Sequence, residues 1–386
     1  MRNQKLRYGI VGIGKQGHGY AQKLHKGMDK NAVLSAVCDI SEERREWARQ
    51  NLKGVAVFED YHEMFASPEV DAVAVVTPHY IHPEIAIAAM GQGKHVLIDK
   101  PAGVYTRAVR EMNECATAHP GLTFGIMYNQ RTNPLYIKAK QFIESGEMGA
   151  IKRINWIVTN WYRPQAYYDQ GGWRGTWGGE GGGVLTNQCP HQLDLFQWLG
   201  GMPKSVRGYA KVGVNRGIAV ENDVTFYTEY ENGASGVFVT STHDYPGTNR
   251  LEIDGDGGQI VIEQRLAAET MTIHRLKTKE TEFNRVNTKF MPFIPKHTEK
   301  KKAGNLINAY RLLAVGQHIL IFRNFSRAVL FGEKLIAPGI EGIDGLMLSN
   351  AVYLSGWLGR EVALPVDENL YFEELQKRIE QEKQEG

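Results

Sequence analysis

Cysteine is scarce in this chain: its 386 residues include three, Cys38, Cys115 and Cys189. The number is odd and no Cys-x-x-Cys spacing occurs. These features argue against a disulfide framework and against a structural zinc site, and they fit a reducing compartment. We therefore expect no metal site.

Long apolar runs and an excess of one charge are also lacking. No apolar run approaches the ~20 residues that a membrane helix needs, and the start, Met-Arg-Asn-Gln-Lys, has no apolar signal region. Lys and Arg number 45 and Asp and Glu number 43, for a net charge of +2. This balance gives no electrostatic reason to expect nucleic acid or an anionic membrane as a partner. We expect a soluble, cytoplasmic protein.

The first 128 residues alternate short apolar runs with amphipathic stretches. Nearly continuous Val- and Ile-rich runs are typical of strands covered on both faces, and the strand–helix alternation indicates an α/β fold with a doubly wound parallel sheet. The predicted strands are Tyr8–Val11, Val33–Cys38, Val55–Phe58, Ala72–Val76, His95–Ile98 and Thr123–Met127. The predicted helices are Gly17–Lys26, Ser41–Asn51, Tyr61–Ala66, Pro83–Gly91 and Thr106–Ala118.

The pattern changes after Met127, so we predict two domains, residues 1–128 and 129–386. Long alternating segments in the second predict an α+β domain with a large, mostly antiparallel open sheet. Its predicted strands are Ile151–Tyr162, Ser205–Val214, Asp223–Tyr230, Gly236–Thr240, Arg250–Ile253 and Gln259–Ile262. Its predicted helices are Asn133–Ser145, Ala303–Phe331, Gly345–Leu358 and the charged tail Glu368–Gly386, while residues 277–302 are expected to form a basic, polar surface excursion.

A GxGxxG motif follows the first predicted strand and opens the first predicted helix. It comprises Gly12, Ile13, Gly14, Lys15, Gln16 and Gly17. In a dinucleotide site, such glycines make the tight turn, admit the diphosphate to the backbone and pack helix on strand, and the diphosphate sits at the helix N-terminus. The second strand ends at Asp39, whose carboxylate is placed to accept both ribose hydroxyls. The alternative interpretation is a glycine turn with a capping Asp.

The residue after Asp39 bears on the choice of cofactor. It is Ile40 rather than Arg, which favours NAD because a carboxylate without a nearby arginine repels a 2′-phosphate. Ser41, Arg44 and Arg45 follow closely, so use of NADP stays open.

Two further motifs follow predicted strands at the carboxyl edge of the sheet, where open α/β sheets bind ligands. The first is Thr77-Pro78-His79, which can equally be a proline-containing strand exit. The second is Asp99-Lys100-Pro101. The Lys100 ammonium is suited to stabilise a substrate alkoxide as hydride leaves, although a surface lysine is the plain alternative.

The segment 178–201 contains three consecutive glycines before a predicted helix. On that helix Asn187 and His191 are spaced i and i+4 and are expected to share a face, and Asp194 is placed to orient the imidazole. A histidine that titrates near neutral pH suits removal of a hydroxyl proton. A lone helix histidine is more often structural, but the glycines suggest that the backbone must approach something closely, which favours a functional role.

Aromatic and arginine side chains precede this segment. They include Trp161, Tyr162 and Arg163, and then Trp173 and Arg174. Aromatic faces with arginine forks suit a polyhydroxylated ring, so we expect Arg163, Trp173 and Arg174 to contact substrate. The alternative is a core aromatic cluster.

Together these motifs resemble the Gfo/Idh/MocA family, which includes glucose–fructose oxidoreductase and inositol dehydrogenase. The resemblance covers essentially the whole chain. Its marks are GIGKQG at 12–17, VVTPHYIHPEIAIAAMGQGKHVLIDKP at 75–101, GGGVLTNQCPHQLD at 181–194 and AVYLSGWLGREVALP at 351–365.

The resemblance implies a Rossmann domain at 1–128 and a substrate-binding and oligomerisation domain at 129–386, whose open sheet often builds dimers or tetramers. It implies that Lys100 is the catalytic lysine and His191 the acid/base, with Asn187 at a position that often carries Asp. It also implies cofactor contacts by residues in the strand-exit motifs, His82 and Asp99 among them, and contacts of Asn129 with both cofactor and substrate.

The sequence thus predicts an NAD(P)-dependent oxidoreductase acting on a secondary alcohol of a sugar, inositol or related cyclic polyol. In this hypothesis His191 removes the hydroxyl proton, Lys100 stabilises the alkoxide and Asn187 holds the hydroxyl. Two alternatives stay open: an NAD-dependent glycoside hydrolase that works by transient oxidation and elimination, and a non-catalytic NAD or sugar sensor.

Overall fold

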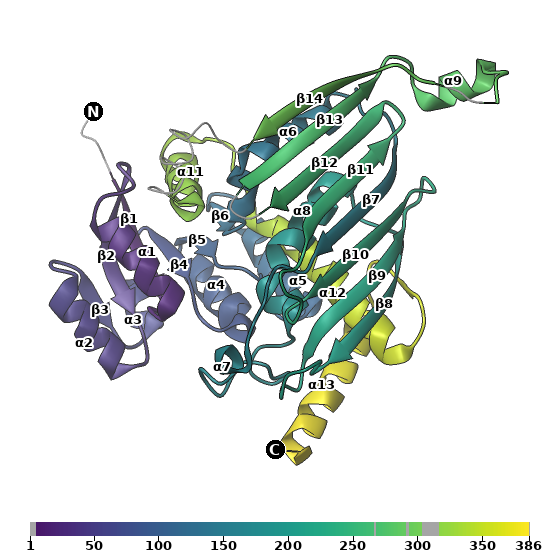
Figure 1. Cartoon of the computed structure of the whole chain (residues 1–386). Helices are drawn as coiled ribbons and strands as arrows, with labels where there is room; N and C mark the ends of the chain where they lie inside the picture. The colour runs from purple at the N-terminus through teal and green to yellow at the C-terminus, as the bar shows by residue number, and fades with distance from the viewer. Residues whose placement is uncertain (1–4, 266–267, 291–292, 303–315, 386) are drawn as a thin grey trace. The chain divides into compact units, whose positions relative to one another are not determined.

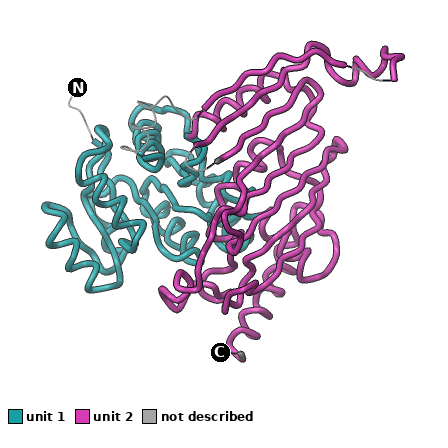
Figure 2. The backbone as a smooth tube through the Cα atoms, viewed as in Figure 1, with its two compact units in different colours: residues 1–132, 311–346 teal, residues 133–310, 347–386 magenta. Residues whose placement is uncertain are grey.

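The computed structural model describes residues 5–265, 268–290, 293–302 and 316–385. The chain divides into two compact units (Figure 2). Unit 1 comprises residues 1–132 and 311–346, and unit 2 comprises residues 133–310 and 347–386. The chain therefore leaves unit 1 close to the predicted boundary at residue 128, and a later segment returns to it.

Unit 1 is built on a six-stranded parallel sheet with the order β3-β2-β1-β4-β5-β6, in which the strand order reverses at β1 (Figure 1). This is the doubly wound topology expected from the sequence. The strands are β1 (Leu6–Val11), β2 (Ala32–Cys38), β3 (Ala56–Phe58), β4 (Ala72–Val75), β5 (His95–Ile98) and β6 (Phe124–Ile126). The helices between them are α1 (Lys15–His25), α2 (Glu42–Asn51), α3 (Tyr61–Ala66), α4 (His82–Gly91) and α5 (Thr106–Ala118).

The returning segment completes the core of unit 1. Its helix α11 (Gln317–Phe331) buries one apolar stripe, which includes Phe322 and Phe325. The Phe322 ring meets the ring of Tyr8 in β1 edge-on, with centroids 5.4 Å apart. The predicted helix Ala303–Phe331 is thus confirmed over α11, and residues 303–315 lie outside the described part of the chain.

Unit 2 contains a nine-stranded sheet with the order β14-β13-β12-β11-β7-β10-β9-β8-β15 (Figure 1). Every neighbouring pair of strands in it is antiparallel except β7 and β10, which are parallel. The sheet is therefore mostly antiparallel, as predicted from the sequence. The strands are β7 (Ile151–Val158), β8 (Ser205–Val212), β9 (Glu221–Glu229), β10 (Ser235–Ser241), β11 (Asn249–Gly255), β12 (Gly258–Arg265), β13 (Ala268–Leu276), β14 (Lys296–Lys302) and β15 (Val362–Ala363).

One face of this sheet is buried beneath helices. Phe196, on α8 (Pro190–Gly200), packs against Phe226 of β9 and Phe238 of β10, with ring centroids 5.9 and 5.7 Å apart. The other helices with residues in unit 2 are α6 (Pro134–Glu144), α7 (Gln165–Tyr168), α9 (Glu280–Val286), α12 (Gly342–Leu358) and α13 (Glu368–Glu385). The tail helix α13 packs within this unit, where Tyr371 stacks on Trp357.

The region expected to be a surface excursion matches the prediction in part, because α9 buries no residue, and departs from it at β14. Residues 277–302 contain the short helix α9 and the strand β14, and β14 pairs with β13 as the edge of the sheet. The sequence of β14, Lys-His-Thr-Glu-Lys-Lys-Lys, has no apolar alternation because both of its faces are largely exposed. Lysines on an edge strand oppose edge-to-edge association.

Among the described helices, none combines the length and apolarity needed to cross a lipid bilayer.

Candidate active site

The three motif glycines meet different surroundings in unit 1. Gly12 has a φ of +86°, and a Cβ there would lie 2.5 Å from the Val76 carbonyl oxygen. A Cβ on Gly17 would lie 1.9 Å from the Gly12 carbonyl oxygen. At Gly14, by contrast, the nearest atom to such a Cβ is a guanidinium nitrogen of Arg44 at 3.6 Å. The turn and the helix packing thus require the outer two glycines, whereas a side chain at Gly14 would make only ordinary contact with Arg44.

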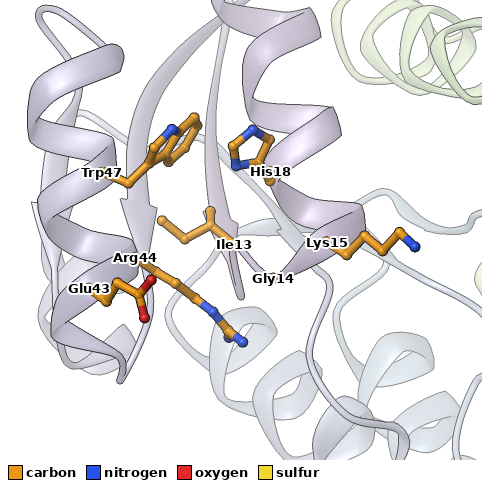
Figure 3. A pocket seen from close by; sticks show the side chains of 7 residues that line it. All are labelled: Ile13, Gly14, Lys15, His18, Glu43, Arg44 and Trp47. Carbon is orange, nitrogen blue, oxygen red and sulfur yellow. The ribbon is translucent and has the colours of Figure 1, made fainter. Parts of the chain in front are cut away.

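Gly14 lines a groove of about 430 Å³ between the starts of α1 and α2 (Figure 3). The His18 ring of α1 and the Trp47 ring of α2 lie 3.8 Å apart, while Lys15 points away from them (Figure 3). Helix α1 begins after Gly14 without a side-chain cap, so its first N–H groups are available to an anion. The groove is lined by Ile13, Gly14, Lys15, His18, Glu43, Arg44 and Trp47.

Asp39 contacts two residues that line this groove, Ile13 and Arg44. The backbone N–H groups of Ile13 and Ser41 donate to the Asp39 carboxylate at 2.8 and 2.9 Å. Arg44 Nη1 lies 3.3 Å from its Oδ2. The following residue, Ile40, is 87% exposed. Asp39 therefore connects the glycine loop to the start of α2, a role that the sequence did not indicate.

The strand-exit motifs of β4 and β5 are tied together by His82. Its ring nitrogens lie 2.7 Å from the Thr77 carbonyl oxygen and 2.9 Å from the Pro101 carbonyl oxygen. Burial lowers the pKa of His82, so the ring is neutral at pH 7 and donates to one carbonyl at a time. His82 itself is 1% exposed. The structure therefore places it beneath the motif that bears Lys100, where it supports that motif.

Sequence analysis missed a histidine close to Lys100 in unit 1. His318, on α11, has Nε2 3.2 Å from Asn129 Nδ2. Burial, together with the positive charges of Lys23 and Lys100, lowers the pKa of His318 to about 4. A neutral Nε2 accepts the Asn129 N–H. Because His318 follows Asn129 by 189 residues in the sequence, no local pattern indicates this neighbour.

These features fit a dinucleotide. The Gly14 backbone leaves room for a diphosphate, the N–H groups at the start of α1 suit its charge, and the Asp39 carboxylate suits ribose hydroxyls. Residues on the Gly12–Gly17 loop, Asp39, and the strand exits at Thr77 and Lys100 would hold it.

In unit 2, the three consecutive glycines pack against the protein itself. A Cβ on Gly182 would lie 2.3 Å from the Tyr353 hydroxyl, and one on Gly183 would lie 1.9 Å from the Glu221 carbonyl oxygen. The Glu221 carboxylate accepts the backbone N–H groups of Gly183 and Leu185 and the Tyr353 hydroxyl, at 2.8, 3.0 and 2.7 Å. The close approach inferred from the glycines is therefore internal packing, and it does not itself indicate a ligand.

The helix expected to carry both Asn187 and His191 is divided in two. Asn187 lies in a π-helical turn, Val184–Gln188, and His191 lies in the first turn of α8, which begins at Pro190. The i, i+4 face expected of one continuous α-helix is thus wrong. The physical reason is that Glu221 fixes the N–H groups at the start of the turn, and Pro190 has no N–H to continue the helical ladder. Asp194 is fully buried and accepts a hydrogen bond from Gln197 at 3.2 Å.

The arginines predicted to contact substrate gather around Tyr167 of α7. The guanidinium carbons of Arg163 and Arg174 lie 5.0 and 4.8 Å from the centre of its ring. The guanidinium of Arg174 also lies 4.5 Å from the Trp173 ring centre, and its Nη1 donates to the Tyr167 hydroxyl at 2.8 Å. Tyr167 was not among the predicted site residues, although it lies in the aromatic segment.

The alternative of a core aromatic cluster holds for other members of that segment. Trp156 is completely buried, and Trp177 is 4% exposed and packs on Tyr353. Tyr162, by contrast, is 43% exposed. The aromatic residues thus divide into buried core members and an accessible group near the arginines.

Comparison with known proteins agrees with this architecture. A model of the oxidoreductase family NAD-binding Rossmann fold matches residues 6–124, and a model of the GFO/IDH/MocA C-terminal domain matches residues 136–261. The scyllo-inositol 2-dehydrogenase (NAD(+)) of Bacillus subtilis is 28% identical over 263 residues, which are 67% of this chain and 74% of that protein. The myo-inositol 2-dehydrogenase of Thermotoga maritima is 26% identical over 66% of this chain and 74% of that protein.

A solved structure extends the similarity to nearly the whole chain. It is the WlbA dehydrogenase from Bordetella pertussis in complex with NADH and UDP-GlcNAcA, which is 26% identical and covers 94% of this chain and all of that one, with a TM-score of 0.75. Both halves of the fold and the dinucleotide site in unit 1 are therefore shared with NAD-binding dehydrogenases. This chain belongs to the Gfo/Idh/MocA family of NAD-binding oxidoreductases.

Proposed function

We propose that this protein is an NAD-dependent dehydrogenase that oxidises a secondary alcohol of a sugar, an inositol or a related cyclic polyol. Two relatives named above are inositol dehydrogenases, and a third was solved with a sugar nucleotide. Family membership supports the reaction class, and the side chains of unit 2 support the substrate class.

The observation that carries the substrate class is the polar cluster in the segment before α8. Asn187 and Arg174 each donate a hydrogen bond to the Tyr167 hydroxyl, and Trp173 lies against Arg174. Amide, phenol and guanidinium groups bond to hydroxyls, and an aromatic face packs on the C–H face of a sugar ring. An apolar substrate would make no use of these polar groups.

The proposed chemistry removes a proton from the alcohol oxygen and a hydride from its carbon, which leaves a ketone. His191 takes the proton as general base, a role typically worth ~10²–10⁴ in rate. Lys100 donates a hydrogen bond to the oxygen and stabilises its developing negative charge. Bound NAD supplies the hydride acceptor. His82 keeps the Lys100 motif in place through the Pro101 carbonyl.

The test is a spectrophotometric screen at 340 nm, with NAD and NADP supplied separately. The candidate substrates are myo-inositol, scyllo-inositol, D-glucose, D-xylose, levoglucosan and a set of glycosides. Accumulation of NADH with a polyol or sugar supports the proposal. Cleavage of a glycoside without net NADH indicates the hydrolase alternative, and NADH binding without turnover of any compound indicates a sensor.

A further inference from the structure

Arg163 is held in place between the end of β7 and the start of α7, in unit 2. Its backbone N–H donates to the Thr242 carbonyl oxygen at 2.8 Å, and its own carbonyl oxygen accepts from Arg216 Nε at 2.7 Å. Its guanidinium carbon lies 5.7 Å from the centre of the Trp161 ring and 5.0 Å from that of Tyr167. These contacts determine where the guanidinium lies.

The charge of Arg163 is not balanced by an acidic side chain. Its Nη1 donates to the Tyr162 carbonyl oxygen at 3.0 Å, and no carboxylate in the described part of the chain forms an ion pair with it. Arg174, which also lies over the Tyr167 ring, has the buried carboxylate of Glu180 at 3.7 Å. Arg163 therefore brings to this ring a positive charge that still lacks a counter-charge.

The hydrogen-bond donors of Arg163 and Trp161 are incompletely used. Arg163 Nε and Trp161 Nε1 are buried, and neither has an acceptor among the residues that the structure describes. Both groups can only donate. Since Nη1 is bonded to Tyr162, the guanidinium edge formed by Nε and Nη2 is left for an acceptor. Such an edge presents two parallel N–H groups, the geometry that binds both oxygens of a carboxylate or two oxygens of a phosphate.

A neutral hydroxyl suits these donors less well than an anion does. A hydroxyl brings a proton that needs an acceptor of its own, and it leaves the guanidinium charge unbalanced. An ionised carboxylate or phosphate brings several acceptor oxygens together with the opposite charge. The unused donors and the unpaired charge at Arg163 thus indicate the same kind of ligand.

The hydroxyl end of Tyr167 has a different character. Gln188 is 7% exposed, and its Nε2 lies 3.3 Å from the Tyr167 hydroxyl oxygen. Its Oε1 is buried and has no hydrogen-bond partner among the described residues. A neutral amide oxygen accepts a hydrogen from a hydroxyl. Tyr167 therefore has a cationic group over its ring and a neutral acceptor beside its hydroxyl.

We infer that Arg163 and Trp161 form an oxyanion subsite, and that the substrate is a sugar acid: a polyhydroxylated ring that carries a carboxylate or a phosphate group. Arg163 pairs with the anion, the Trp161 N–H donates to it, and Gln188 Oε1 accepts from a hydroxyl of the same molecule. This inference rests on the proposed function and narrows it, since that function covers neutral sugars and inositols equally.

The experiment uses the full-length protein, NAD, and pairs of compounds that differ in the acidic group. D-Glucuronate is compared with D-glucuronamide, which has nearly the same shape without the charge, and D-galacturonate with D-galactose. The pair of D-glucose-6-phosphate and D-glucose tests phosphate separately from carboxylate. We expect kcat/KM for the preferred acid to exceed that for its neutral partner by roughly 10- to 100-fold, the range for a hydrogen bond to a charged group.

Binding is measured independently of turnover. Isothermal titration of the same pairs, in the presence of NADH, gives a Kd for each compound, and the acid should bind about 10-fold or more tightly than its neutral partner. These titrations decide whether the subsite exists even if no compound is oxidised.

Three variants test the two residues of the subsite. Arg163→Met keeps a long side chain against the rings but removes the charge and the donors, so the preference for the acid should fall by about 10-fold or more. Arg163→Lys keeps the charge without the paired N–H groups and should retain part of the preference. Trp161→Phe keeps a ring beneath Arg163 without its N–H, and the preference should shrink several-fold.

The matched control is Arg207→Met, which removes an arginine that lies 5.0 Å from the centre of the Tyr209 ring in the same unit. It should keep the wild-type preference. Because the preference is a ratio for one protein, general damage to the active site affects both of its terms. Thermal melts identify variants that fail to fold, and if Arg163→Met does not fold, Arg163→Lys and Trp161→Phe decide the question.

The outcomes are distinct. Absence of turnover with every compound, neutral or acidic, overturns the proposed function, while tighter binding of the acids still supports the subsite. Neutral partners that are bound and oxidised as well as the acids overturn this inference alone. An unchanged preference in a folded Arg163→Met variant also overturns it, because another group would then bind the anion. A preference confined to the uronates or to the phosphate supports the inference and identifies the oxyanion.

Discussion

The side chain of Asp39 accepts a hydrogen bond from the backbone N–H of Ile13, with 2.8 Å between nitrogen and oxygen. The end of β2 thereby holds the middle of the glycine loop. The same carboxylate pairs with Arg44. Asp39 thus shapes the glycine loop, and in the proposed cofactor site it would also face the ribose, so its removal should affect affinity and cofactor choice together.

For Asp39→Ala we expect NADH to bind roughly 10- to 100-fold more weakly, because a hydrogen-bonding charged group is worth about 1.5–3 kcal/mol. The affinity for NADPH should fall less than that for NADH, since Arg44 is then available to pair with the 2′-phosphate. Fluorescence titration with each nucleotide measures both constants. The matched control is Asp60→Ala, an Asp that follows β3 and caps α3 through the His62 N–H. Equal weakening of both nucleotides would show that Asp39 acts only on the loop.

The proposed general base is tested by His191→Ala. We expect kcat to fall by ~10²–10⁴, the usual worth of a general base, while the affinity for NADH changes little because the dinucleotide site is in unit 1. Stopped-flow turnover and NADH titration measure the two quantities. His297→Ala, a change at an exposed position of β14 in the same unit, serves as control. Near-normal turnover of the His191→Ala variant would show that His191 is not the general base.

Replacement of His82 tests whether the strand exits need to be tied together. In His82→Phe the ring is kept but the carbonyls of Thr77 and Pro101 lose their buried polar partner, at a cost of about 1–3 kcal/mol. We expect a lower melting temperature and a kcat reduced by about 10-fold, because the Lys100 motif is less well held. His25→Phe, at an exposed site on α1, is the control. Normal kcat in a destabilised His82→Phe variant would limit His82 to a role in stability.

Much of unit 1 could be predicted from the sequence. Its strands were predicted within one or two residues because buried parallel strands are continuous Val- and Ile-rich runs. For example, all four residues of Ala72–Val75 are buried. The return of residues 316–346 to this unit could not be predicted. Nothing in α11 itself indicates which of two cores its apolar stripe covers, and Phe322 meets Tyr8 across more than 300 residues of chain.

The candidate site was predictable by residue type and only partly by arrangement. The motifs predict Lys100, Asn187 and His191 as site residues, but the spacing rules assume a regular helix and therefore missed the π-helical turn. The contact of Glu180 with Asn187 depends on how the loop between them folds. Spacing along the sequence does not determine such a contact. The same holds for the pairing of Asn129 with His318.

His318 predicts a loss of stability in acid. Its pKa is lowered to about 4 in the folded protein, against 6.5 ordinarily. Between pH 4 and 6.5, His318 binds a proton in the unfolded chain but not in the folded chain. The free energy of unfolding therefore falls as the pH drops from about 6.5 towards 4. At about 1.4 kcal/mol per pH unit, the full effect is about 3 kcal/mol. We expect His318→Asn, which cannot titrate, to lose less stability than the wild type over this range.

Denaturant unfolding at several pH values from 4.5 to 7.5 measures this difference. Above pH 6.5 the two proteins should keep a constant difference in the free energy of unfolding, because both states of His318 are then neutral. The exposed His62→Asn is the control and should follow the wild type. Parallel curves for the wild type and His318→Asn below pH 6.5 would mean that His318 titrates normally in the folded protein.

Glu221 predicts a pH dependence of the opposite sign. Burial raises its pKa to about 7, although its three hydrogen-bond donors oppose the rise. Between pH 4.5 and 7 the folded protein keeps a proton that the unfolded chain has released, so this contribution to stability is complete below pH 4.5 and is lost as the pH rises through 7. Glu221→Gln should remove this slope. It should also lower kcat, since the amide nitrogen of Gln would face the Gly183 N–H, donor against donor, and displace the turn that carries Asn187.

Glu229→Gln, on the same strand but half-exposed beside Lys204, is the control. A Glu221→Gln variant with the wild-type pH slope and kcat would contradict both parts of the argument, because the carboxylate would then neither hold a proton near pH 7 nor position the turn.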